Sequence, residues 1–160
     1  MELNIRKATL DDLDRLAEIE KEAFPPEEAA PKKSYKWRLE HFSEFAFVGE
    51  SNGIIVGAVI GRPTKEKTIV DDLYEPQELP IGDSYAILSV LTAMDYRKKG
   101  VAEKIMNYTI SEMKKKNMET LCLTCKKQLI HYYAKFGFKE LGVSKSTHGG
   151  AIWYDMNMQI

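Results

Sequence analysis

Hydrophobic and polar residues along the chain follow two periods, one typical of strands and one typical of helices. Segments that alternate or stay apolar over a few residues predict strands at 3–7, 45–49, 54–60, 86–94, 118–125, 138–143 and 151–158. Segments with apolar residues three or four apart predict helices from Thr9 or Asp11 to Ala23, from Ser34 through Phe42, from Gly100 to the lysines at 114–116, and over 129–135.

The connections between these segments narrow the fold. Asn52-Gly53 lies between two apolar runs, and both residues accept the positive φ of a tight hairpin turn. Pro25-Pro26 ends the first helix, and residues 62–82 form a long connection of the kind that is often functional or mobile. The order of strands and helices predicts one α/β domain, 1–160, with a mixed, mostly antiparallel sheet flanked by helices.

Residues 85–104 carry the clearest candidate chemistry. An apolar strand is followed by a short basic loop with Arg97, Lys98 and Lys99, and then by Gly100 and a helix. The first N–H groups of a helix have no intrahelical partner, and the helix dipole favours negative charge there. Gly100 lets a ligand come close to the backbone, and the small Ala102 keeps the first turn narrow. We therefore predict an anion-binding site in this loop.

Composition removes several other classes of function. The chain has 160 residues, 44% of them hydrophobic and 29% charged, as in a folded domain. A formal net charge of −1 gives no general field for nucleic acid, and no apolar run is long enough to span a bilayer. The N-terminal segment is amphipathic and acidic, unlike a signal peptide. We expect a soluble, cytoplasmic protein that binds neither nucleic acid nor membrane.

The two cysteines are spaced as in some redox and zinc sites, but their context differs. Cys122 and Cys125 lie within an expected strand, where residues three apart point to opposite faces. Redox cysteines favour the start of a helix, and no second pair of ligands completes a zinc site. We predict that both thiols stay free and that the protein holds no metal.

Two motifs resemble signatures of the GNAT superfamily of N-acetyltransferases. Arg97-x-x-Gly100-x-Ala102 is similar to its pyrophosphate-binding motif, and the segment from Tyr132-Tyr133 to Phe136-Gly137-Phe138 is similar to a second, aromatic motif. Their order and separation match the family, and the resemblance covers nearly the whole chain. The arylalkylamine (serotonin) N-acetyltransferase branch and its bacterial relatives are most similar, through Glu22-Ala23-Phe24, residues 52–57, Cys125 and the aromatic motif.

This resemblance implies acetyl-CoA as cofactor, held where two parallel central strands, 86–94 and 118–125, splay apart. The pantetheine arm would follow Val90, Leu91 and Thr92. The pyrophosphate would contact Arg97, Lys98, Lys99, Gly100, Val101, Ala102 and Glu103. Tyr133 occupies the position of the general acid that protonates the departing thiolate. Phe24 and Pro31 are candidates for the acceptor site, where they favour a small amine with an apolar body.

The chain departs from the animal enzymes of that branch at the general base. Ala86 and Leu88 stand where those enzymes carry two histidines, and Lys126 replaces an asparagine that is common in the superfamily. Asp83, Glu28, His148 or a chain of waters could take the proton instead.

We predict acetyl transfer from acetyl-CoA to a primary amine in a ternary complex, with a small arylalkylamine or polyamine-like acceptor. The alternatives are a protein or peptide amine acetyltransferase and a CoA-binding module without turnover. A homodimer is left open.

Overall fold

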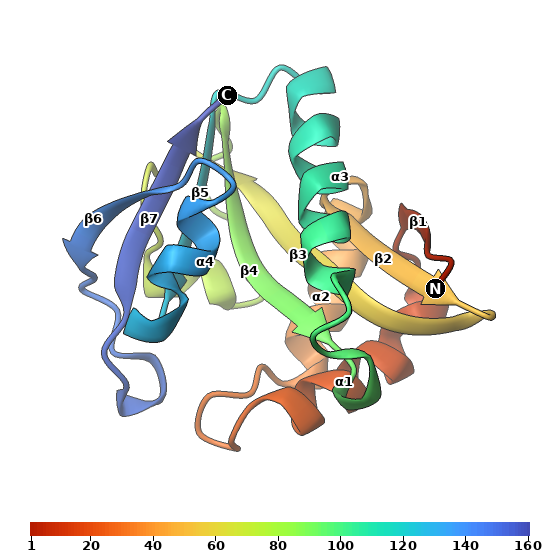
Figure 1. Ribbon diagram of the computed structural model, residues 1–160. Coiled ribbons are helices and arrows are strands. Elements are labelled where there is room, and N and C mark those ends of the chain that lie inside the picture. Colours follow the sequence, from red (N-terminus) through yellow and green to blue (C-terminus); the bar gives the residue numbers. More distant parts are fainter.

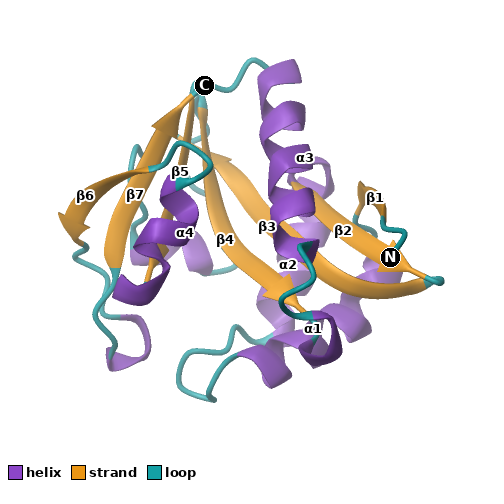
Figure 2. Ribbon diagram, in the orientation of Figure 1, coloured by secondary structure: helices purple, strands orange, loops and turns teal.

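The computed structural model covers residues 1–160 and contains one seven-stranded mixed sheet with the order β1-β2-β3-β4-β5-β7-β6 (Figures 1 and 2). Its strands are β1 Asn4–Lys7, β2 Ala46–Ser51, β3 Ile54–Thr64, β4 Ser84–Thr92, β5 Thr120–Cys125, β6 Lys139–Val143 and β7 Tyr154–Gln159. Its α-helices are α1 Leu13–Ala23, α2 Lys32–Phe42, α3 Val101–Lys115 and α4 Ile130–Ala134. The predicted mixed, mostly antiparallel sheet with flanking helices is confirmed.

The helices cover both faces of the sheet. In Figure 1, α3 and α4 lie in front of the strands, and α1 and α2 lie behind them. One core cluster joins α3 and α4 to the sheet through residues such as Val101 and Ile105, and a second joins α1 and α2 through Leu16 and Tyr35. Strand β3 is buried on both faces, which explains its nearly continuous apolar sequence.

The two central parallel strands separate along their length. Strand β4 pairs with β5 only at three positions, Ser84 with Thr120, Tyr85 with Leu121 and Ala86 with Cys122. Beyond Ala86, β4 continues beside β3 to Thr92, and β5 continues beside β7 to Cys125. The predicted splay is therefore present, and it opens toward the C-terminal ends of both strands.

A β-bulge lies inside the opening. Ile87 pairs with Gly61 and Ser89 pairs with Ile60, so Leu88 is the extra residue on β4. A bulge of this kind bends a strand and changes the direction of the side chains beside it. Glycine is required at position 61, where β3 lies beside the bulge in β4, because a Cβ there would lie 2.2 Å from the Ala86 carbonyl oxygen.

Some predicted boundaries are wrong by a few residues. Helix α2 begins at Lys32, directly after Pro31, and not at Ser34. Strand β3 extends through Thr64, so the connection to β4 is shorter than the predicted 62–82 segment. Arg62 conceals this extension in the sequence, because its charge suggests a loop although only 1% of the residue is exposed.

Arg62 fastens the connection between β3 and β4 to the sheet. Its guanidinium donates to the carbonyl oxygens of Leu73, Glu75 and Gln77 at 2.8–3.3 Å, and it lies over the Trp37 ring. These three carbonyl groups of the β3–β4 connection thus receive hydrogen bonds that they would otherwise lack. The predicted mobility of this connection stays a prediction.

Both cysteines are free, as predicted, and both are buried. Cys122 packs with Ile69 and Leu73 on one face of the sheet, and Cys125 belongs to the cluster of α3 and α4 on the other. Burial raises the pKa of Cys122 to about 12 and that of Cys125 to about 11, so both remain thiols near neutral pH.

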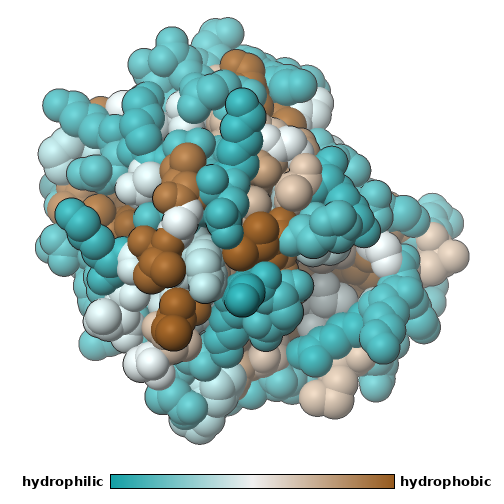
Figure 3. All heavy atoms as spheres, turned by 60° about the vertical axis from the view of Figure 1, so that its left-hand side comes forward, coloured by the Kyte–Doolittle hydropathy of each residue, from teal (hydrophilic) through white to brown (hydrophobic).

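Surface features add little further chemistry. Figure 3 shows hydrophobic groups separated by hydrophilic surface, and the exposed apolar residues include Leu141 and Val143 of β6 and Ile152. No cluster of three or more His, Cys, Asp or Glu side chains is placed to hold a metal ion. None of the helices is long and apolar enough to cross a membrane.

Candidate active site

Two cavities follow one another along β4. The larger, of about 440 Å³, lies in the opening between β4 and β5, and the smaller, of about 300 Å³, lies at the start of α3. Val90 of β4 lines the larger cavity and Thr92 the smaller. On α4, Tyr133 lines the larger cavity and Tyr132 the smaller. The two cavities therefore share the same strand and the same helix as walls.

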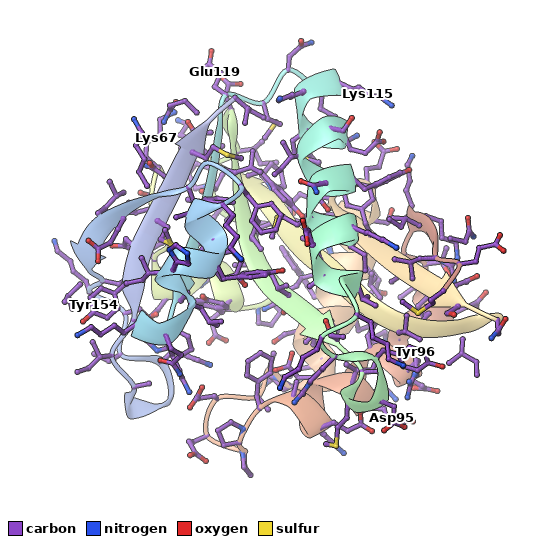
Figure 4. All side chains as sticks on the ribbon, in the orientation of Figure 1. Lys67, Asp95, Tyr96, Lys115, Glu119 and Tyr154 are labelled. Atoms are coloured by element: carbon purple, nitrogen blue, oxygen red, sulfur yellow. The ribbon has the colours of Figure 1, made fainter.

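The smaller cavity has the backbone geometry of an anion site. Gly100 precedes α3 with a φ of +78°, and Lys98 also has a positive φ of +63°. Lys104 makes the first intrahelical bond, to the Gly100 carbonyl oxygen at 3.1 Å, so the N–H groups just before it have no backbone acceptor. Figure 4 places Asp95 and Tyr96 at this end of α3 and Lys115 at the far end.

Most residues predicted to bind the pyrophosphate line this smaller cavity: Arg97, Lys98, Gly100, Val101, Ala102 and Glu103. Lys99 does not line it, and its ammonium lies 5.5 Å from the centre of the Tyr96 ring. Leu91 is fully buried in the cluster with α1 and α2, so its backbone alone is available to a cofactor.

Tyr133 lies at the wall of the larger cavity. Its ring packs against Tyr132, Phe136 and Phe138, and its hydroxyl makes no hydrogen bond within the chain. Burial raises the pKa of this phenol, so it is protonated near neutral pH and can donate. The position suits a general acid at the end of the opening.

The acceptor candidates Phe24 and Pro31 also line the larger cavity. Both belong to the connection between α1 and α2, which forms one side of the cavity. Tyr74 and Trp153 add aromatic surface from the other side, and Tyr74 stacks on His148 with ring centres 5.4 Å apart. The cavity thus has apolar, aromatic walls of the kind that bind small organic ligands.

The three side chains considered as bases have different surroundings. Glu28 is bound by Lys126, with Nζ 2.8 Å from its Oε1. His148 Nε2 donates to the Glu28 carbonyl oxygen at 2.8 Å. Asp83 precedes β4 and lines neither cavity. Lys126, which follows β5 and stands where an asparagine was expected, therefore connects the α1–α2 connection to the end of β5.

A buried polar cluster was missed by the sequence analysis. Glu20 of α1, Tyr35 and Arg38 of α2, and Ser89 of β4 meet in the wall of the larger cavity, which all of them except Tyr35 line. Charged residues on amphipathic helices normally face solvent, so residue type alone gave no reason to place Glu20 and Arg38 in the interior. The spacing of Tyr35 and Arg38, which places both on one face of α2, was the available signal.

The sequence profile of the acetyltransferase (GNAT) family matches residues 13–138, and the chain belongs to this family. The predicted enzyme class, an acetyltransferase that uses acetyl-CoA, is confirmed at the level of the family. No curated protein matches the chain significantly by sequence.

Solved structures share the fold over whole chains. Ard1 from Thermoplasma volcanium has a TM-score of 0.79 at 18% identity, covering 100% of this chain and 99% of that one. The PaiA N-acetyltransferase from Thermoplasma acidophilum in complex with coenzyme A gives 0.74 at 16%, with 100% of both chains covered. Arabidopsis thaliana Naa50 in complex with the bisubstrate analogue CoA-Ac-MVNAL gives 0.77 at 18%, again over 100% of both chains. At such identities the likeness concerns the fold alone.

Proposed function

We propose that this protein transfers the acetyl group of acetyl-CoA directly to the primary amine of a small arylalkylamine or polyamine-like molecule. The observation that carries the proposal is the larger cavity, which the α1–α2 and β6–β7 connections close from the outside. Its volume of about 440 Å³ is in the range of small-molecule sites. The likeness to the arylalkylamine N-acetyltransferase branch points the same way.

The cofactor would lie along β4 and join the two cavities. Its pyrophosphate would accept from the free N–H groups at the start of α3, with Arg97 and Lys98 adding positive charge. Its pantetheine arm would run past Thr92 and Val90 into the opening. The thioester would then lie beside Tyr133.

The charge of the larger cavity favours a cationic acceptor. The carboxylates of Glu20, Glu28, Asp71 and Glu75 line it, against the cations Arg38 and Lys126. Its aromatic walls suit the apolar body of an arylalkylamine, and a cation can also bind over an aromatic face. A protonated amine is therefore attracted, and the site must then remove a proton before attack.

The reaction needs three groups at the thioester. The neutral amine nitrogen attacks the carbonyl carbon and forms the C–N bond, while backbone N–H groups of β4 stabilise the oxyanion. Collapse of the tetrahedral intermediate breaks the C–S bond. Tyr133 gives its phenolic proton to the CoA thiolate and regains one from the nitrogen.

Contacts within the chain oppose a peptide acceptor. Residues of the α1–α2 and β6–β7 connections line the larger cavity, so an extended peptide would have to enter between these two connections. Here His148 donates to the Glu28 carbonyl oxygen, and Gly149 is so close that a Cβ on it would lie 2.6 Å from Glu28 Cγ. Together with the pair of Lys126 and Glu28, these contacts occupy the space that a peptide would need.

A panel of acceptors tests the proposal. The protein is incubated with acetyl-CoA and 2-phenylethylamine, spermidine or a peptide with a free N-terminus, and acetylated products and released thiol are both measured. We expect acetylated amine in proportion to released thiol, and little acetylated peptide. Acetylation of the peptide alone would support the protein acetyltransferase instead. Binding of acetyl-CoA without any acetylated product would indicate the non-catalytic module.

A further inference from the structure

The proton acceptor for the amine is missing from β4, since Ala86 and Leu88 cannot titrate. The buried polar cluster lies directly behind this part of the strand. Glu20, Tyr35 and Arg38 are at most 3% exposed, and Ser89 is 7% exposed. Burying a carboxylate is costly unless it is paired. A cluster of this kind, in the wall of a reaction cavity, calls for an explanation beyond packing.

The hydrogen bonds of the cluster have a defined direction. The Tyr35 hydroxyl lies within hydrogen-bond distance of both Glu20 Oε1 and Ser89 Oγ, the latter at 3.0 Å. A phenol has one proton, and the carboxylate is the stronger acceptor, so Tyr35 donates to Glu20. Ser89 must then donate its own proton to the Tyr35 oxygen. Arg38 Nη1 lies 3.5 Å from Ser89 Oγ on the other side.

This chain of hydrogen bonds connects two points on the wall of the larger cavity, Ser89 on β4 and Glu20 on α1. Ser89 lies on β4 between the bulge residue Leu88 and Val90, and all three line the larger cavity. From there the bonds lead through the fully buried Tyr35 to Glu20, whose second oxygen accepts from the Ala30 N–H at 3.1 Å. A proton that enters at Ser89 can thus reach a carboxylate by two short transfers.

We propose that Ser89, Tyr35 and Glu20 form a relay that removes a proton from the bound ammonium, with Glu20 as the final acceptor. The inference rests on the proposed function and adds the base that it lacks. The nitrogen of an ammonium loses two protons on becoming an amide. One ends on the CoA thiol through Tyr133, and the other passes to Ser89 as the Ser89 proton moves to Tyr35 and the Tyr35 proton to Glu20. Glu20 later releases this proton to solvent.

The surroundings of Glu20 suit this role. Burial raises the pKa of its carboxyl, while Tyr35 and Arg38 from α2, the Ala30 N–H and the charge of His148 from the β6–β7 connection act in the opposite direction. Burial outweighs these groups, so the net effect is to raise the pKa of Glu20 from its ordinary value toward neutral pH, where a base is most effective. Burial also raises the pKa of Tyr35, which keeps that phenol protonated in the resting relay.

The sign of the pH dependence follows. Glu20 accepts a proton only when it is ionised, so kcat should fall as the pH drops through the raised pKa of Glu20. A purely structural cluster would change the amount of folded protein and leave the pH profile of the folded enzyme in place.

The test compares two acceptors of nearly the same shape. 2-Phenylethylamine binds as an ammonium, whereas 2,2-difluoro-2-phenylethylamine is much less basic because of its fluorines and binds largely neutral. A neutral amine loses one proton in the reaction, which goes to the thiol, so it does not need the relay. Glu20→Gln and Tyr35→Phe should lower kcat for 2-phenylethylamine by about 10²-fold or more. The loss with the fluorinated amine should be much smaller.

Controls separate chemistry from folding. Glu22→Gln changes an exposed carboxylate on the same helix and should leave both rates unchanged. Glu20→Asp should retain more of the rate than Glu20→Gln does. In Glu20→Gln, the fall of kcat at low pH (the acid limb of the profile) should disappear. Tyr35→Phe interrupts the relay with the Glu20 charge intact, which covers the case in which Glu20→Gln does not fold.

Equal losses with both amines, or an acid limb that persists in Glu20→Gln, would overturn the relay and leave the proposed function standing. A wild-type protein that acetylates neither amine would overturn both.

Discussion

Tyr133 is buried, yet its hydroxyl has no hydrogen-bond partner. This combination distinguishes a proton donor from a tyrosine that only packs in the core. The hydroxyl of a buried tyrosine normally makes a hydrogen bond, as that of Tyr85 does by donating to the Phe45 carbonyl oxygen at 2.6 Å. Tyr133 has no such partner and faces the cavity that we assign to the thioester. Its local motif was enough to predict this position, because helix α4 is short and lies next to β5 in the chain.

Tyr133→Phe should lower kcat by about 10² to 10⁴-fold and leave CoA affinity nearly unchanged, because only the donated proton is lost. Steady-state kinetics with 2-phenylethylamine and calorimetry with CoA measure the two effects. Stability should change little, since no buried hydrogen bond is broken. A variant with full kcat on its best amine would remove Tyr133 from the mechanism.

Residues of the relay could not be predicted in the same way. Glu20 lies four residues after Leu16 and three before Ala23, on the apolar face of α1, but its partners Tyr35 and Ser89 come from α2 and β4, which are distant in sequence. Phe24 and Pro31 were predicted from their aromatic and apolar character in the connection after the first helix, which are local properties. Local signals therefore indicated the rim of the cavity, and contacts between distant elements formed its polar wall.

The backbone conformation of the loop between β4 and α3 is determined by the local sequence alone. The backbone places Gly100 in the left-handed region and leaves the next N–H groups free, and both features follow from a basic strand-to-helix turn with glycine. The pairing of Lys126 with Glu28 has no such local signal, because 98 residues separate the two side chains. The sequence therefore predicted the backbone of this loop, and it gave no indication of the contact between Lys126 and Glu28.

Gly100→Glu should abolish CoA binding while the fold persists. A Cβ at Gly100 meets no atom within 4 Å, so the side chain has room, but its carboxylate would face the pyrophosphate. A non-glycine residue at this φ costs roughly 1–2 kcal/mol, which Gly100→Gln shares. Calorimetry on both variants isolates the charge: Gln should weaken binding moderately, and Glu should remove it.

If Gly100→Glu bound CoA as tightly as Gly100→Gln does, the pyrophosphate would lie elsewhere. Thermal melting of the two variants provides the control, since equal melting temperatures show that the comparison concerns binding and not folding.

At the scale of the whole molecule, the splay of β4 and β5 organises both halves of the site. It places the cavity beside Tyr133 on one side of Val90 and the anion loop beyond Thr92 on the other. The number of strands was predictable from hydrophobic periodicity, whereas the splayed pair of parallel central strands came from family resemblance and the full strand order was not predicted. Pairing between distant strands depends on side-chain packing across the sheet, which periodicity does not report.

The most direct test of the account is a crystal structure of the protein with a bisubstrate analogue, in which CoA is joined through the acetyl group to 2-phenylethylamine. We predict that the pyrophosphate contacts the N–H groups of Val101 to Glu103. The sulfur should lie within reach of the Tyr133 hydroxyl, and the amine nitrogen should lie near Ser89 in the larger cavity. An analogue whose amine half lies outside this cavity, or whose pyrophosphate binds away from the start of α3, would contradict the account.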